Sequence, residues 1–300
     1  MWSLNRCGQL SAVLSLLLSI GAPAVSAQTT TPDLPVLLAP AIRGGDYRPA
    51  PAEEVKRAEA LFLRLAQGAD PAALAAEASQ LAMTLDRVGA LVIVREADQA
   101  KQGRGFFVFR RDPAPETRAD VLLVPHGFKD EMTRDIGLAL FHQGRFAAAA
   151  WNTVPRSYER NGVSVDADMA HLPGTWFTAF ALAAARAWPA GQTLQIHGFD
   201  QGKRKSDAAA EADMILSNGT RTAGPQLRRQ QQCLATALAR PVLLYSDSMR
   251  ELGGTTNVQG AALRELGYPG FVHIEMSRPL RQALRDDEAT RAALLRCLQP

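Results

Sequence analysis

The sequence predicts a three-layer α/β/α fold built on a mainly parallel, mixed β-sheet. From residue 91 onward, short apolar runs alternate with amphipathic stretches of helical length. Runs that are apolar at consecutive positions are typical of strands covered by helices on both faces. The composition agrees, because 47% hydrophobic and 21% charged residues supply a full core and exclude a disordered chain.

The elements follow one another in a regular order. Strands are expected at LVIV (91–94), FFVF (106–109), VLLVP (121–125), AAAAW (147–151), TLQI (193–196), DMIL (213–216), PVLLY (241–245) and FVHIE (271–275). Helices are expected at 132–143, 174–188, 225–239 and 258–266.

The amino end predicts a secretory signal over residues 1–27. Arg6 precedes the apolar stretch 10–20, and the small residues Val25-Ser26-Ala27 suit cleavage after Ala27. The apolar stretch is shorter than the roughly 20 residues that span a bilayer, which disfavours the alternative of a membrane anchor. We therefore expect a secreted or periplasmic protein with no stable membrane insertion after the signal is removed.

Three further segments follow the signal. Residues 28–51 lack periodicity and predict a flexible leader. Residues 52–88 predict an N-terminal helical segment, with helices at 52–67 and 71–88 that form a small cap. Residues 89–300 contain the alternating strands and helices, and we expect them to form one α/β catalytic domain.

Charge and cysteine content limit the classes of partner. The net charge of +3 is not concentrated in any block, which excludes nucleic acid as a partner because phosphate recognition needs clustered Lys and Arg. Cleavage of the signal removes Cys7 and leaves Cys233 and Cys297, both on expected helices. An exported compartment permits a disulfide between them, and two free buried thiols are the alternative.

Histidines and a carboxylate collect at strand ends. His126 and His197 each follow an apolar run and each precede a glycine, while His273 and Glu275 lie in the last run. Functional groups of open α/β sheets gather at the carboxyl ends of the strands. The glycines permit another group to approach the backbone closely. These residues are therefore the candidates for a site.

Their chemistry fits a catalytic zinc ion. Two imidazoles and one carboxylate supply three ligands and leave a fourth position for water. We expect His126, Glu131 and His197 as the ligands, with Asp130 as the alternative carboxylate. Glu275 could then accept the proton of the water as general base.

Three segments resemble a known family. VPHGFKDEMTRDIGLAL (124–140), IHG (196–198) and IEMSRPLRQAL (274–284) are similar, in this order, to motifs of the phage poly-γ-glutamate hydrolases. That family consists of zinc enzymes with the carboxypeptidase-A-like phosphorylase/hydrolase fold. The resemblance spans roughly residues 119–286, and its last motif is the most specific.

The resemblance implies zinc on His126, Glu131 and His197 and a catalytic base at Glu275. It also draws attention to Arg278 and Arg281, which follow that base and could hold an oxyanion or a substrate carboxylate. For Arg281, a solvent-exposed helix face is the alternative. This sequence departs from the family at Phe128, which replaces a glycine, and at Asp130, which leaves open which carboxylate binds the metal.

Other residues are weaker candidates for substrate binding. Strand alternation places His273 on the same face as Glu275, so that it could line the cleft, although a structural role is the alternative. SNGTR (217–221) offers Asn218 and Arg221 for a substrate carboxylate, and a plain turn at Asn218-Gly219 is the alternative.

We therefore expect an exported, zinc-dependent hydrolase that cleaves a peptide or γ-glutamyl-type amide in a small peptide or poly-glutamate-like substrate. One alternative is an α/β-hydrolase, because GFDQG (198–202) fits a nucleophile elbow with Asp200 as nucleophile, supported by His126-Gly127 and His273. The other is a non-catalytic exported binding protein. The sequence does not address the oligomeric state.

Overall fold

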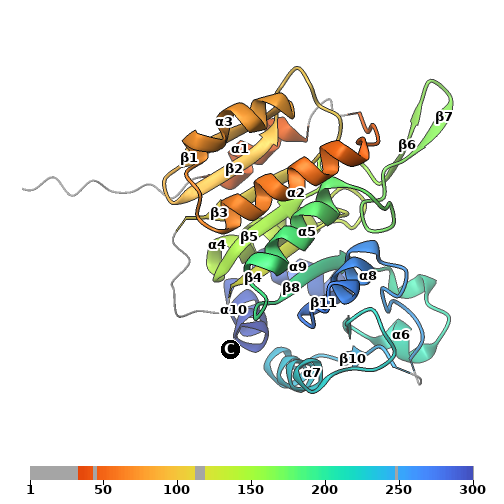
Figure 1. Cartoon of the computed structure of the whole chain (residues 1–300). Coiled ribbons are helices and arrows are strands. Elements are labelled where there is room, and N and C mark those ends of the chain that lie inside the picture. The colour runs from red at the N-terminus through yellow and green to blue at the C-terminus, as the bar shows by residue number, and fades with distance from the viewer. Residues whose placement is uncertain (1–32, 43–45, 112–118, 247–248, 300) are drawn as a thin grey trace, which may run out of the picture. The chain divides into compact units, whose positions relative to one another are not determined.

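A nine-stranded mixed sheet organises the chain. The computed structural model describes residues 33–42, 46–111, 119–246 and 249–299. The strands lie in the order β1-β2-β3-β5-β4-β8-β11-β9-β10 (Figure 1). Their bounds are β1 Met83–Val88, β2 Leu91–Glu96, β3 Phe106–Arg110, β4 Asp120–Val124, β5 Phe146–Trp151, β8 Thr193–Gly198, β9 Met214–Ser217, β10 Val242–Leu244 and β11 Phe271–Met276.

Parallel strands form the centre of this sheet. β5, β4, β8 and β11 pair in parallel, whereas β1, β2 and β3 join one side as antiparallel neighbours and β9 pairs antiparallel with β11 on the other. A separate antiparallel hairpin, β6 (Ser157–Arg160) and β7 (Val163–Asp166), projects from the body in Figure 1.

Helices cover both faces of the sheet. One face carries α2 (Ala52–Ala66), α3 (Pro71–Gln80), α5 (Trp176–Ala187) and α8 (Val258–Glu265). The other carries α1 (Leu34–Ala41), α4 (Thr133–Gln143), α7 (Pro225–Leu238), α9 (Arg278–Asp286) and α10 (Glu288–Leu298). The prediction of a three-layer α/β/α fold on a mixed sheet is thus confirmed.

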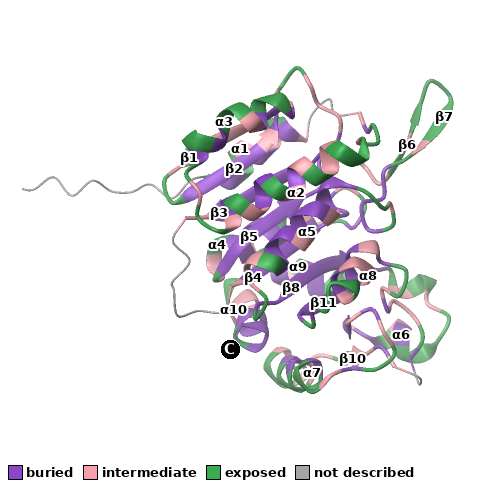
Figure 2. Ribbon diagram, in the orientation of Figure 1, coloured by how far each residue is buried: buried purple, intermediate pink, exposed green. Residues whose placement is uncertain are grey.

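The central strands are buried on both sides, as their uninterrupted apolar runs predict (Figure 2). In β4, Leu122 and Val124 pack into the core under α1, α4, α7, α9 and α10, while Val121 and Leu123 pack into the core under α2, α3, α5 and α8. Alternate side chains of a strand point to opposite faces, so a strand with helices on both sides needs apolar residues throughout.

The amino-terminal part differs from the expectation in three places. Residues 34–41, expected in a flexible leader, form α1, whose Leu34 and Leu38 are buried. The helix expected at 71–88 ends at Gln80, and residues 83–88 form the edge strand β1. α2 packs on α5 and the sheet, with Phe62 4.5 Å from Phe107 between ring centroids, and is therefore part of the layered body and not a separate cap.

The physical reason for the error at 71–88 is a chain reversal after α3. Ala82 adopts a left-handed conformation with φ of 56°, and the next six residues pair antiparallel with β2. Alanine-rich composition continues the helical pattern up to this reversal, but MTLDRV is mostly half-buried, with Met83 buried and Arg87 exposed, and lacks the uninterrupted apolar run of the central strands. Arg95 of β2 and Asp86 of β1 form an ion pair of 3.0 Å across the two strands.

A disulfide joins Cys233 of α7 to Cys297 of α10, with 5.6 Å between their Cα atoms. The predicted pairing is therefore present in the structure. Residues 1–27, the expected signal, lie outside the described residues. Within the described part of the chain, no helix combines the length and apolar character needed to cross a membrane.

Candidate metal centre

Three adjacent strands deliver the candidate residues to one edge of the sheet. β4 ends at Val124, two residues before His126, and β8 carries His197 near its own end. β11 pairs with β8 so that Glu275 lies opposite His197. Because these strands are parallel, their carboxyl ends meet at one edge, and the predicted convergence of the two histidines and Glu275 is found.

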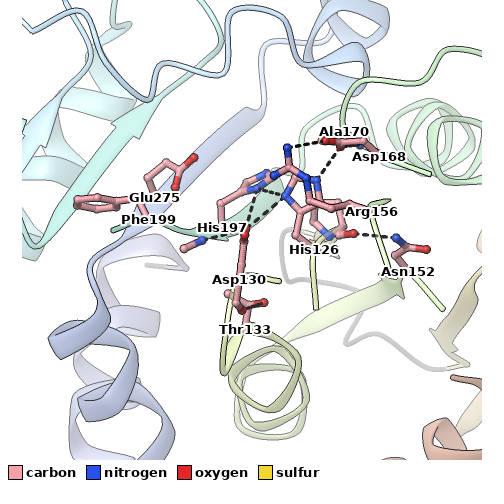
Figure 3. A network of polar contacts seen from close by, with 12 residues as sticks. His126, Asp130, Thr133, Asn152, Arg156, Asp168, Ala170, His197, Phe199 and Glu275 are labelled. Atoms are coloured by element: carbon pink, nitrogen blue, oxygen red, sulfur yellow. Dashed lines mark hydrogen bonds and ion pairs between the residues drawn. The ribbon is translucent and has the colours of Figure 1, made fainter. Parts of the chain in front are cut away.

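Three donor atoms form a compact triangle at this edge (Figure 3). His126 Nδ1 lies 3.1 Å from His197 Nδ1 and 3.3 Å from Asp130 Oδ2. His197 Nδ1 lies 3.4 Å from the same carboxylate oxygen. All three side chains are buried. We call His126, Asp130 and His197 the triad.

Asp130, not Glu131, supplies the carboxylate of the triad, which corrects the preferred assignment from the sequence. The chain makes one helical turn after β4, in which Asp130 N donates to His126 O at 3.0 Å, so the side chain four residues on returns to His126. Glu131, one position later, points elsewhere. Its side chain is 59% exposed and pairs with Arg278 Nη2 at 3.3 Å.

The outer nitrogens of the two histidines are both engaged. His126 Nε2 donates to Asp168 Oδ1 at 2.7 Å, and His197 Nε2 donates to Gln195 Oε1 at 3.0 Å. A ligating histidine usually donates its second N–H to such an acceptor, which orients the ring. Each ring therefore directs its Nδ1 toward the centre of the triad, where a metal ion would bind.

Sequence reasoning missed Asp168. This residue lies in the loop between β7 and α5, and it also contacts Arg156 Nη2 at 3.0 Å and His171 Nδ1 at 3.1 Å. No local pattern around position 168 indicates proximity to His126, 42 residues earlier. Its loop position between two elements is the only signal, since functional side chains are common in loops held by a rigid scaffold.

Electrostatics in the triad favour a bound cation. Burial alone would lower the pKa of His126, but hydrogen bonds to Asp130 and Asp168 raise it to about 9. Burial would raise the pKa of Asp130, but hydrogen bonds with His126 and His197 hold it far below its usual range. Burial lowers the pKa of His197, which leaves that ring neutral. The raised pKa of His126 means that a proton is held among these three groups near neutral pH, and a metal ion bound at the same point would replace that proton.

The donor set fits zinc. Four ligands placed tetrahedrally at 2.0–2.1 Å from zinc are separated by about 3.3 Å, which is close to the three separations in the triad. Two imidazoles and one carboxylate are also a ligand set of catalytic zinc sites. The triad therefore meets the requirements of a metal site in donor type, spacing and outer hydrogen bonds.

Glu275 and His273 lie beside the triad. The His273 ring packs on the His197 ring with 4.6 Å between centroids, and His273 Nε2 lies 3.8 Å from Glu275 Oε1. Burial raises the pKa of Glu275 to about 8 and lowers that of His273 well below its usual value. Gly254 is required here, because a Cβ at that position would lie 2.8 Å from the His273 ring.

A cavity of about 680 Å³ opens over these residues. Basic side chains outnumber acidic ones on its wall. The basic residues are Lys129, Arg156, Lys203, Arg204, Arg250, Arg278 and Arg281, and the acidic ones are Asp130, Glu131, Asp200 and Glu275. This excess of positive charge favours an anionic ligand.

Arg281 is a buried cation in this cavity and not part of a solvated helix face. It is 6% exposed, and its Nη1 donates to Phe199 O at 3.2 Å, while its Nε has no hydrogen-bond partner among the described residues. A Cβ on Gly198 would lie 2.4 Å from Arg281 Nη1. The glycine after His197 thus permits the close approach that the His-Gly pattern predicted.

Two predicted binding residues lie outside the cavity. Asn218 Oδ1 accepts from Thr220 N and its Nδ2 donates to Thr222 O, both at 3.0 Å, and Arg221 is exposed. The Asn218 side chain is thus hydrogen-bonded within its own loop. This segment is therefore a plain turn, which was the alternative to a binding site.

The nucleophile elbow is also not formed. Asp200 has an extended backbone with φ of −103° and caps a three-residue 3₁₀ helix, Gln201–Lys203, through Gly202 N. A nucleophile elbow instead requires a sharp, strained turn that leads into a helix.

Comparisons with known proteins give only distant likenesses. No protein-family model and no curated protein matches the chain. One similar solved structure is N-formylglutamate amidohydrolase from Ralstonia eutropha, with 16% identity, a TM-score of 0.38 and coverage of 62% of this chain and 92% of that one. Another is a metallo-carboxypeptidase from Pseudomonas aeruginosa, with 13% identity, a TM-score of 0.37 and coverage of 67% and 60%.

Proposed function

We propose that this protein is an exported, zinc-dependent hydrolase that cleaves an amide bond of peptide or γ-glutamyl type. The observation that carries the proposal is the convergence of the triad with Glu275 in one cavity. His126, Asp130 and His197 would hold the ion through Nδ1, Oδ2 and Nδ1. The chemistry of such an ion, when bound, is Lewis-acid activation of water and of a carbonyl group.

Glu275 is the general base in this proposal. Its carboxylate accepts a proton from the attacking water and delivers it to the leaving nitrogen of the amide. A base works best when its pKa is near the working pH, and burial brings the pKa of Glu275 to about 8. The pairing of β11 with β8 fixes Glu275 beside His197, so the base is held next to the triad by main-chain hydrogen bonds.

Arginines supply the anion-binding groups. Arg281 presents a guanidinium in the cavity wall, and such a group suits a charge-assisted hydrogen bond to a substrate carboxylate or to an oxyanion. Arg278 lies in the cavity wall with 64% of its side chain exposed, where it contacts Glu131. We propose that Arg281 binds a negative group of the substrate and that Arg278 assists with negative charge that develops during the reaction.

The substrate is proposed to carry a carboxylate close to the scissile amide. A poly-glutamate-like chain, a peptidoglycan stem peptide and the carboxyl end of an ordinary peptide all meet this description. The basic excess in the cavity supports this class, and the motif resemblance to poly-γ-glutamate hydrolases favours the first member. Export rests on the predicted signal at residues 1–27, and the Cys233–Cys297 disulfide is in keeping with an oxidising compartment.

The test combines metal content and turnover. Elemental analysis of the purified protein should find about one zinc per chain, and the zinc-loaded protein should cleave at least one of the three substrate classes. Glu275→Gln should keep the metal and lose most turnover, while Glu131→Gln serves as the matched control from the same cavity. Activity that survives chelators, or full activity in Glu275→Gln, would overturn the mechanism.

The non-catalytic binding protein is distinguished by the same measurements. A binding protein has no need for a buried carboxylate beside two imidazoles, but it would retain ligand affinity in Glu275→Gln and show no turnover in any form. Binding of a carboxylate ligand without cleavage of any of the three substrates would favour this alternative.

A further inference from the structure

A buried network of carboxamides lies behind His197. Gln195 and Gln259 have no exposed surface, and Asn257 is 2% exposed. Burial of a polar side chain is unfavourable unless its hydrogen bonds are made, so three neighbouring amides in a core need a reason. These residues come from β8 and from the start of α8, and they are adjacent to His197 through Gln195.

The amides form a branched chain of hydrogen bonds. Gln195 Oε1 accepts from His197 Nε2 at 3.0 Å and from Asn257 Nδ2 at 2.5 Å. Gln195 Nε2 donates to Gln259 Oε1 at 3.0 Å. Gln259 Nε2 in turn donates to Met169 O at 2.7 Å.

Two main-chain groups fix the direction of every bond in this network. Met169 O is a carbonyl and can only accept, so the amide nitrogen of Gln259 must face it and its oxygen must face Gln195. Gly260 N can only donate, and it donates to Asn257 Oδ1 at 2.9 Å, so the amide nitrogen of Asn257 must face Gln195. Both branches require that Gln195 turn its oxygen toward Asn257 and His197.

We propose that Gln195, oriented by Gln259 and Asn257, is a positioning residue that keeps the imidazole proton of His197 on Nε2. An oxygen that can only accept stabilises the tautomer with hydrogen on Nε2, which leaves the Nδ1 lone pair directed at the triad. The inference rests on the proposed function, because it concerns the affinity of the triad for its metal.

The two histidines of the triad differ in this respect. His126 donates to a carboxylate, Asp168, whereas His197 donates to a neutral amide. Asp130 already places one negative charge against both rings. The Gln195 amide therefore orients His197 without placing a second carboxylate beside that ring. The orientation of this amide is set by Met169 O and Gly260 N, which act through Gln259 and Asn257.

The test measures the position of the proton and the affinity for zinc separately. Two-bond ¹H–¹⁵N spectra of the metal-free protein distinguish protonated from bare imidazole nitrogens, and five histidines in the chain keep the spectrum simple. Wild type should show His197 with hydrogen on Nε2. Gln195→Met removes the acceptor, so the hydrogen should move to Nδ1 and donate to Asp130, and the zinc Kd should rise about 10- to 100-fold.

Conservative and matched variants separate positioning from general loss of packing. Gln195→Glu keeps an acceptor beside His197 and should keep the hydrogen on Nε2. Gln259→Met leaves the contact with His197 in place but removes the anchor of Gln195, and its zinc Kd should rise about tenfold. Gln230→Met removes another buried amide, which bonds Gln192 on the far side of the sheet from α8, and should change neither readout.

The outcomes are distinct. Movement of the proton in Gln195→Met with weaker zinc binding, absent in Gln230→Met, supports the proposal. The proposal is overturned if Gln195→Met retains the Nε2 hydrogen and binds zinc with wild-type affinity. If Gln195→Met does not fold, unchanged zinc affinity in Gln259→Met overturns the proposal. Wild-type protein that binds no zinc would instead contradict the proposed function.

Discussion

Replacement of Glu275 by Gln should stabilise the metal-free protein at alkaline pH, although it removes the proposed base. Burial raises the pKa of Glu275 from 4.5 to about 8. The folded state therefore holds this proton more tightly than the unfolded chain does. The resulting contribution to stability is fully present below pH 4.5 and is lost as the pH rises through 8.

The magnitude follows from the two pKa values. Between pH 5 and pH 8, the stability of wild type should fall relative to Glu275→Gln by about 3.5 kcal/mol, and by about 2 kcal/mol if water in the cavity solvates the carboxylate. Gln mimics the protonated carboxyl group in shape and does not ionise. The difference between the two proteins thus isolates the proton on Glu275.

Urea denaturation of chelator-treated protein at pH 5 and pH 8, with the disulfide intact, measures this difference. Glu131→Gln is the control, because it removes an exposed carboxylate from the same cavity and should change stability little at either pH. If wild type and Glu275→Gln differ by the same free energy at both pH values, the burial of an ionisable Glu275 is not the cause and the reasoning fails.

Three further predictions concern the metal, the arginine and the disulfide. Asp130→Asn should raise the zinc Kd at least 10-fold by isothermal titration, whereas Glu131→Gln should not, and the reverse result would restore Glu131 as the ligand. Gly198→Ala should displace Arg281 and lower kcat/KM on a carboxylate substrate about 10- to 100-fold. Gly224→Ala is the control, because a Cβ there meets nothing within 4 Å, and it should leave kcat/KM unchanged. The double variant Cys233→Ala, Cys297→Ala should lose about 4 kcal/mol of unfolding free energy in urea, because the disulfide closes a long loop. Equal stability of the variant and wild type would show that the unfolded chain gains little conformational freedom when the disulfide is removed.

Much of the fold was predictable because its signals are local. Consecutive apolar residues in runs such as 121–125 indicate strands buried on both faces, and these strands are found where expected. The edge strand β1 was missed because its residues are mostly half-buried and do not form an uninterrupted apolar run, so its pattern merges with that of an alanine-rich helix. α1 was missed because its eight residues include two prolines and its burial depends on partners far along the chain.

The sequence by itself determined where the buried strands lie and which side chains stand at their ends, and so it identified His126, His197 and Glu275. Only the tertiary structure decided the rest of the site. Asp130 and Glu131 differ by one position, and the direction of a side chain after a single helical turn selects between them. Asp168 and Gln259 reach the site through hydrogen bonds to partners 42 and 64 residues away, and such contacts depend on the path of the whole chain and not on any local pattern.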